Sequence, residues 1–134
     1  MKSKTISLIL SIFLIFETIP AYAVTSAAQL SETAHKAYNQ SNFLKSAEYY
    51  EKAYSLEKNK IFIDNAITSY SSYAFNLANE KKYDEAIKYC KKVLSMRPAE
   101  KNAQELLSDI YYSRSSDYFY NGNQEKAKED LENA

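Results

Sequence analysis

Residues 83–98 read YDEAIKYCKKVLSMRP, and this stretch decides the fold of the chain. Its apolar positions follow one another at steps of one and three residues, which places them on one face of an α-helix. These positions are Tyr83, Ala86, Ile87, Cys90, Val93 and Leu94. Pro98 cannot continue the helix but suits the first turn of another, so it marks a junction. The stretch therefore predicts an amphipathic helix followed by a second helix.

The pattern recurs along the chain at an offset of about 40 residues, a period typical of stacked helical pairs. In the first copy the matching residues are Ala34, Ala37, Asn39, Phe43, Tyr49, Ala53 and Tyr54. They return as Ala74, Leu77, Asn79, Tyr83, Tyr89, Val93 and Leu94. A weaker third copy continues with Ser115, Tyr118, Tyr120, Gln124, Asp130 and Ala134. We therefore expect one structural unit repeated three times.

The chain contains few residues that end a helix: one glycine, Gly122, and two prolines, Pro20 and Pro98. Apolar residues return at helical spacing between the polar breaks. This pattern predicts an all-α protein of six helices in three pairs. The expected helices cover residues 25–40 with 43–57, 61–80 with 83–96, and 99–120 with 123–134. Short turns make each pair antiparallel, and neighbouring pairs must stack to cover their apolar faces.

Residues 83–98 resemble the second helix of a tetratricopeptide repeat, and residues 42–53 and 122–127 resemble it less closely. The resemblance implies a short right-handed α-solenoid of three such pairs, about 25–57, 61–96 and 99–134, within a domain spanning 24–134. Together with the first 23 residues, described below, it indicates a bacterial exported protein of this kind, with lengthened first helices. The family period is about 34 residues, so the extra length falls in the first helices of the second and third pairs.

The third copy departs from the pattern. Gln124 replaces an aromatic residue, and Arg114 stands where Tyr73 predicts a core residue, so we expect this pair to pack loosely. The sequence stops at Ala134 without a polar capping helix, which repeat arrays normally need for solubility. Either the sequence is a fragment of a longer array, or a partner or a second copy covers its end.

The first 23 residues resemble a bacterial signal peptide. Lys2 and Lys4 precede an apolar run, and residues 21–23 form an A-x-A cleavage signal. The run is about ten residues long, too short to cross a bilayer of about 30 Å, which argues against a permanent anchor. Cleavage leaves 15 basic and 16 acidic residues. We therefore expect a secreted or periplasmic protein with no membrane span and no charge pattern for nucleic acid.

Sequence motifs for catalysis or cofactor binding are missing. His35 is the single histidine, Cys90 the single cysteine and Gly122 the single glycine. A two-histidine metal site, an intramolecular disulfide and a glycine-rich phosphate loop are therefore excluded. Cys90 falls at a core position of the repeat. We expect no cofactor, no metal and no enzymatic activity.

The chain has 13 tyrosines and no tryptophan, and six of the tyrosines occupy packing positions of the repeat. In tetratricopeptide-like arrays the first helices line a concave surface, and the resemblance maps this lining onto eleven residues. They are Ser31, His35, Tyr38, Asn39, Ser71, Phe75, Asn79, Tyr112, Ser116, Phe119 and Tyr120. The lining lacks charge, apart from any protonated His35, and lacks the Lys and Arg cluster with which some family members clamp a terminal carboxylate. Its aromatic and amide side chains suit an extended peptide, although they could also pack against the long helices.

Three functions remain open. The first is a non-catalytic scaffold or adaptor that holds a protein or peptide segment in the concave groove. The second is an assembly module that self-associates through its C-terminal pair. The third is a carbohydrate-binding module that uses tyrosines as stacking platforms.

Overall fold

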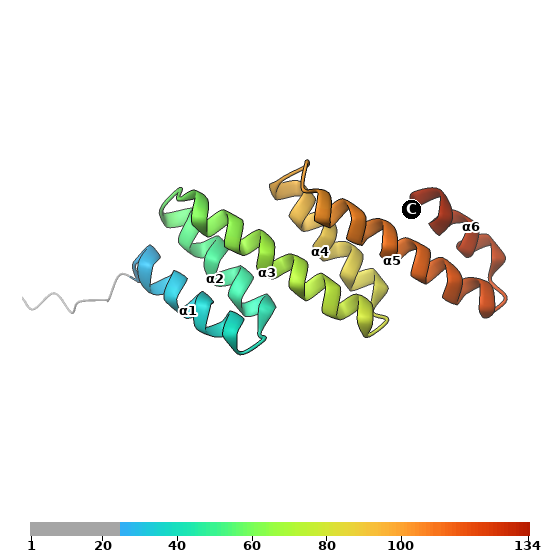
Figure 1. Ribbon diagram of the computed structural model, residues 1–134, viewed down its shortest axis with the longest axis horizontal. Coiled ribbons are helices and arrows are strands. Elements are labelled where there is room, and N and C mark those ends of the chain that lie inside the picture. The colour runs from blue at the N-terminus through green and yellow to red at the C-terminus, as the bar shows by residue number, and fades with distance from the viewer. Residues whose placement is uncertain (1–24) are drawn as a thin grey trace, which may run out of the picture.

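The computed structural model describes residues 25–134, and these form six α-helices joined by short turns (Figure 1). The helices are α1 (Ala27–Asn39), α2 (Phe43–Leu56), α3 (Lys60–Asn79), α4 (Tyr83–Met96), α5 (Lys101–Tyr120) and α6 (Gln124–Asn133). Each end lies within two residues of the range expected from the sequence. The expected signal peptide, residues 1–23, lies outside the described residues.

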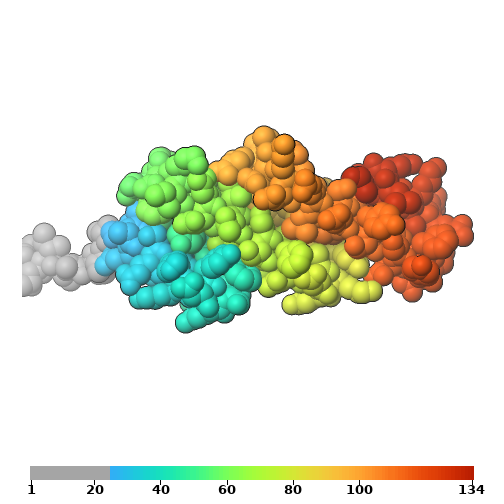
Figure 2. All heavy atoms as spheres, in the orientation of Figure 1, coloured from blue at the N-terminus to red at the C-terminus, as the bar shows by residue number. Residues whose placement is uncertain are grey.

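The helices pack in chain order as three adjacent pairs, α1 with α2, α3 with α4, and α5 with α6. Figures 1 and 2 show an elongated body in which the chain advances from α1 at one end to the α5–α6 pair at the other. The second helix of each pair packs against the first helix of the next, so the core continues from pair to pair. The fold is all-α and has the arrangement of a short tetratricopeptide-like stack.

Small residues occupy the helix crossings. Ala34, Ala53, Ala66, Ala74 and Ala86 are completely buried. An alanine at a crossing lets two helix backbones approach closely, and larger neighbours then fill the space beside it. The largest clusters gather around Ile110 and Cys90, between α3, α4 and α5, and around Ile67 and Val93, where α2, α3, α4 and α5 meet.

Three equivalent turns close the three pairs. Ser41, Lys81 and Gly122 follow the first helices, and all have positive φ, at 58°, 59° and 81°. In the first turn Asn42 N donates to Ala37 O at 2.9 Å and Ser41 N donates to Tyr38 O at 2.8 Å. The other two turns repeat these bonds, which form a Schellman motif and satisfy the last carbonyls of the helix.

Pro98 marks a junction, as the sequence predicts, but it lies before the helix and not in its first turn. Residues 97–100 form the connection, and α5 begins at Lys101. The Arg97 side chain bridges this connection to α3 by pairing with Glu100 and with Asp64. The long third helix is thereby tied to the start of the third pair.

Arg114 makes specific contacts in the third pair, and the loose packing expected of this pair stays a prediction. Arg114 Nε and Nη2 donate to both oxygens of Asp130 at 2.8 and 2.7 Å, and Nη1 pairs with Asp84. The Arg114 and Asp130 side chains are only 18% and 4% exposed. A two-pronged ion pair therefore joins α5 to α6 where the sequence led us to expect an apolar contact.

Glu51 connects three helices near the middle of the array. Its carboxylate on α2 accepts a hydrogen bond from the Tyr70 hydroxyl on α3 at 2.7 Å and from Lys92 Nζ on α4 at 3.0 Å. Partial burial by itself would raise the pKa of Glu51, but the bonds from Tyr70 and Lys92 outweigh it and leave the pKa below its ordinary value. The contact holds the first and second pairs together through charge as well as packing.

Candidate functional site

Two open hollows lie between successive first helices. The first, which we call the α1/α3 hollow, has a volume of about 390 Å³. Its lining comes from α1, α2 and α3 and consists of His35, Tyr38, Asn39, Tyr50, Asn65, Thr68 and Ser69. Burial raises the pKa of the Tyr50 phenol, whose neutral hydroxyl can both donate and accept a hydrogen bond. The hollow offers aromatic faces together with amide and hydroxyl groups.

The second, which we call the α3/α5 hollow, has a volume of about 500 Å³ and a more apolar lining. Phe43 at the start of α2 closes one side, and Phe75 and Leu106 contribute apolar surface from α3 and α5. The remaining lining residues are polar or acidic: Ser71, Ser72, Asn76, Asn102, Glu105 and Asp109. Phe75 remains 54% exposed, although it is a large apolar side chain.

The long helix α3 contributes to both hollows. Asn65 and Thr68 line the first, and Ser72 and Asn76 line the second. These residues are three or four positions apart, so they lie along one face of the helix. At 1.5 Å per residue this face runs about 16 Å from Asn65 to Asn76, roughly the length of five extended peptide residues. The two hollows therefore belong to one surface and not to opposite sides of the molecule.

Of the eleven residues that the sequence assigns to the lining, five meet in the hollows. His35, Tyr38 and Asn39 line the first, and Ser71 and Phe75 line the second. The other six lie outside both hollows and are exposed or half-buried: Ser31, Asn79, Tyr112, Ser116, Phe119 and Tyr120.

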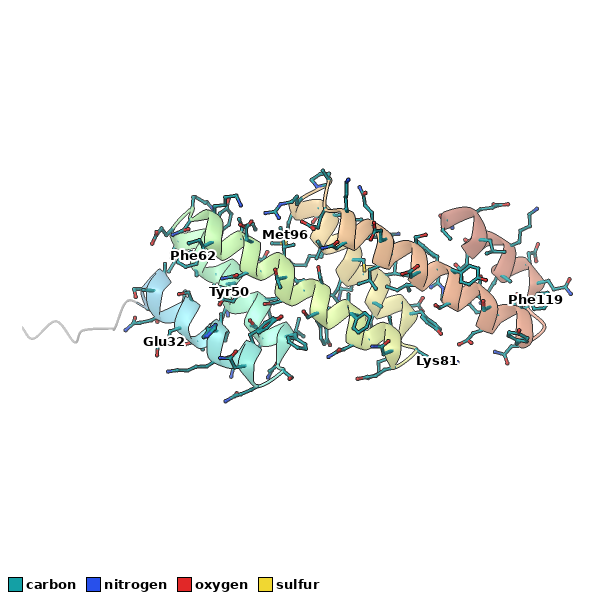
Figure 3. The ribbon with its side chains drawn as sticks, viewed as in Figure 1. Glu32, Tyr50, Phe62, Lys81, Met96 and Phe119 are labelled. Carbon is teal, nitrogen blue, oxygen red and sulfur yellow. The ribbon has the colours of Figure 1, made fainter. Side chains whose placement is uncertain are left out.

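The third-pair members of this set gather near the end of α5. Phe119 and Tyr120 contact each other edge to face, with ring centroids 5.9 Å apart. Tyr112, Phe119 and Tyr120 are among the large apolar side chains left exposed in residues 25–134. In Figure 3, Phe119 lies at the opposite end of the molecule from α1. These rings extend the exposed aromatic surface, but they do not enclose a cavity.

The sequence analysis missed most of the polar lining. The missed polar residues are Tyr50, Asn65, Thr68, Ser69, Ser72, Asn76 and Asn102. Glu105 and Asp109 were also missed, and they bring negative charge to a lining expected to be uncharged. A helical projection of α5 could have found the two acids, because Asn102, Glu105, Asp109 and Tyr112 are three or four residues apart. Which face of α5 turns toward α3 is set by the stacking of the pairs.

The side chains that commonly bind metals or act as nucleophiles are dispersed or buried in the described part of the chain. Within residues 25–134, no group of three or more His, Cys, Asp or Glu side chains converges as a metal site would require. Burial raises the pKa of Cys90 to about 11, so its thiol is poorly reactive at neutral pH. None of the helices that the structure describes is both long and apolar enough to span a bilayer.

Residues 64–100 match the tetratricopeptide repeat family. The matched segment covers most of α3, all of α4 and the connection toward α5, so it includes the Phe75 side of the α3/α5 hollow. Comparison with curated proteins returned no match. Tetratricopeptide repeats are typically non-catalytic and form protein–protein interaction scaffolds, so the match implies a protein partner for at least this part of the chain.

Proposed function

We propose that this protein is an exported adaptor that binds an extended segment of a partner protein along the face formed by α1, α3 and α5. The exposure of Phe75 inside the α3/α5 hollow carries the proposal. A phenylalanine with about half of its surface in water loses hydrophobic stabilisation that burial by a ligand would recover, about 1 kcal/mol. Aromatic side chains in a concave surface are typical anchors for binding.

The polar groups of the two hollows support a peptide as the ligand. An extended segment carries backbone N–H and C=O groups at every residue, and these need partners when a surface covers them. Asn39, Asn65, Asn76 and Asn102 supply amides that both donate and accept. The aromatic rings beside them can receive the side chains of the segment.

The other two functions have weaker support. The exposed side chains of α6 are mostly charged, with Glu125, Lys128, Glu129 and Glu132 around a single exposed leucine, Leu131. Such a surface gives little apolar area for self-association. The exposed rings of Phe119 and Tyr120 stand at 79° to each other, so they do not form one flat platform for a sugar.

Affinity capture tests the adaptor function. The purified protein is immobilised and exposed to the extracellular and envelope fractions of the cells that produce it, beside Phe75→Ala and Ile61→Ala variants. Ile61 is a matched control, because it lies on the same helix, is 62% exposed and lines neither hollow. We expect one partner to be recovered by the wild type and by Ile61→Ala, and lost with Phe75→Ala. Recovery that is equal for all three baits would rule out the hollow as the binding site.

Export is a part of this proposal that needs its own test. The charged start, the apolar run and the A-x-A signal of residues 1–23 support it. Cell fractionation combined with N-terminal sequencing should find the protein outside the cytoplasm, beginning at Val24. A protein that stays in the cytoplasm with residues 1–23 attached would contradict export, while leaving the binding surface untouched.

A further inference from the structure

The strongest feature beyond the proposed surface is the charge of the α3/α5 hollow. Phe43, Phe75 and Leu106 give it apolar surface, and Glu105 and Asp109 line it from one face of α5, one turn apart. Lysine and arginine are absent from its lining. The lining therefore combines apolar side chains with two carboxylates.

The two carboxylates differ from the other acidic residues of the first helices. Glu32 pairs with Lys36, Asp64 with Lys60 and Arg97, and Asp117 with Lys81. Across residues 25–134, Glu105 and Asp109 form no ion pair and no side-chain hydrogen bond. Lys101 precedes Glu105 by one turn on α5, but it neither pairs with it nor lines the hollow.

We infer that the α3/α5 hollow receives a lysine or arginine side chain of the bound peptide segment. This inference rests on the proposed peptide-binding function and names the residue class that the surface selects. The methylene stem of either side chain packs against Phe75 and Leu106, and its charged head reaches Glu105 and Asp109. A lining of apolar and carboxylate side chains fits lysine or arginine better than it fits a purely apolar or an acidic side chain.

The neighbouring α1/α3 hollow adds a spacing to this preference. Its lining has no acidic residue, and its aromatic and amide groups suit an uncharged or aromatic side chain. The residues of α3 that line one hollow are centred about six residues from those that line the other, which is about 9 Å at 1.5 Å per residue. An extended peptide covers this distance in about three residues. A bound segment should therefore carry an apolar or aromatic residue about three positions from its basic residue.

Peptide selection tests the inference. Phage-displayed random linear peptides are selected on the full-length protein, and an enriched peptide is then synthesised with its basic residue either kept or replaced by glutamine. Binding is measured for the wild type, for Phe75→Ala, for the isosteric Glu105→Gln/Asp109→Asn variant and for Glu125→Gln/Glu129→Gln. The last is the matched control, because Glu125 and Glu129 are also exposed, unpaired acids one turn apart, on α6.

We expect enriched peptides to carry a lysine or arginine and to bind the Glu105→Gln/Asp109→Asn variant about fivefold more weakly or worse, as loss of an exposed charge pair implies. The control should bind like the wild type, and the difference should shrink at high salt. Peptides that bind through Phe75 but show no basic preference would overturn this inference and leave the proposed function standing. Selection that yields no peptide dependent on Phe75 would overturn both. Circular dichroism of each variant checks that the helices remain folded.

Discussion

Arg114 and Asp130 form, in the third helical pair, the contact that Tyr73 and Tyr89 form in the second. Both residues lie 41 positions after their counterparts. Tyr73 and Tyr89 meet edge to face with ring centroids 4.9 Å apart, whereas Arg114 binds both oxygens of Asp130. An aromatic contact between α3 and α4 has thus become a charged contact between α5 and α6, with both partners changed together.

This replacement predicts that changing one of the two residues alone strongly lowers the free energy of unfolding. Arg114→Met should lower the free energy of unfolding by about 3 kcal/mol, because it leaves the buried Asp130 carboxylate unpaired. The double variant Arg114→Tyr/Asp130→Tyr should recover most of this loss, because it rebuilds the contact of the second pair. Urea denaturation followed by circular dichroism measures all three proteins.

The control for this prediction is Lys36→Met, which removes an exposed ion pair with Glu32. It should change stability by less than about 0.5 kcal/mol. If Arg114→Met proved as harmless as Lys36→Met, the Arg114–Asp130 contact would not stabilise the third pair.

The three Schellman turns predict that adding a glycine at one turn and removing the glycine at another change the stability in opposite directions. Ser41 has φ of 58°, a conformation that costs about 1–2 kcal/mol for a residue with a Cβ atom. Ser41→Gly should therefore stabilise the protein by about 0.5 kcal/mol after the entropy of glycine in the unfolded chain is counted.

Gly122→Ala makes the opposite change in the equivalent turn of the third pair. A Cβ atom at Gly122 would meet no neighbour within 4 Å, so the cost is confined to the backbone and should be about 1 kcal/mol. Thermal denaturation should show the midpoint rising for Ser41→Gly and falling for Gly122→Ala. Two shifts of the same sign would show that the turns do not carry equivalent strain.

The second pair lacks a helix cap that its neighbours have. Asn42 and Asn123 begin α2 and α6, and each side chain accepts a hydrogen bond from the backbone N–H three residues on. Lys82 holds the equivalent position before α4 and makes no such bond. Lys82→Asn should stabilise the protein by about 1 kcal/mol, and Asn42→Ala should destabilise it by a similar amount. Urea denaturation of both variants measures the effect, and a loss of stability in Lys82→Asn would contradict this reading of the cap.

Glu51 predicts how the stability of the protein depends on pH. The pKa of its carboxyl lies below the ordinary value of 4.5 in the folded state, because Tyr70 and Lys92 donate to it more strongly than burial opposes its charge. A carboxyl group whose pKa is lower in the folded state than in the unfolded state stabilises the protein at pH values above its unfolded pKa. This stabilisation is lost as the pH falls through the folded pKa.

The Glu51→Gln variant should therefore be less stable than the wild type at pH 7 and should lose less stability between pH 5 and pH 3, since glutamine does not titrate. Asp64 and Asp117 also have lowered pKa values, through hydrogen bonds from Lys60 and Lys81 respectively, so acid should still weaken the variant. Urea denaturation at several pH values gives, for each protein, the slope of the free energy of unfolding against pH. Identical slopes for the two proteins would mean that Glu51 contributes nothing to the acid sensitivity.

The fold was largely predictable because its signals are local. The apolar steps in residues 83–98, the scarcity of glycine and proline, and the recurrence at about 40 residues give six helices and their order without any tertiary information. The exposed Phe75 and the cluster of Tyr38 and Asn39 with His35 were also predicted from their places on the first helices. The other lining residues were missed because the sequence does not show which faces of α3 and α5 turn toward each other, and because Phe43 and Tyr50 come from α2.

By itself, the sequence determined the number, length and pairing of the helices and the positions of their buried faces, because helical periodicity depends only on residues three or four apart. The tertiary structure decided what happens between helices. Stacking of α5 on α4 and α6 brings Arg114 to Asp130, and stacking of α5 beside α3 turns Glu105 and Asp109 toward the hollow that holds Phe75. These contacts depend on the rotation and offset of whole helices, which packing across the entire core sets and no local pattern records.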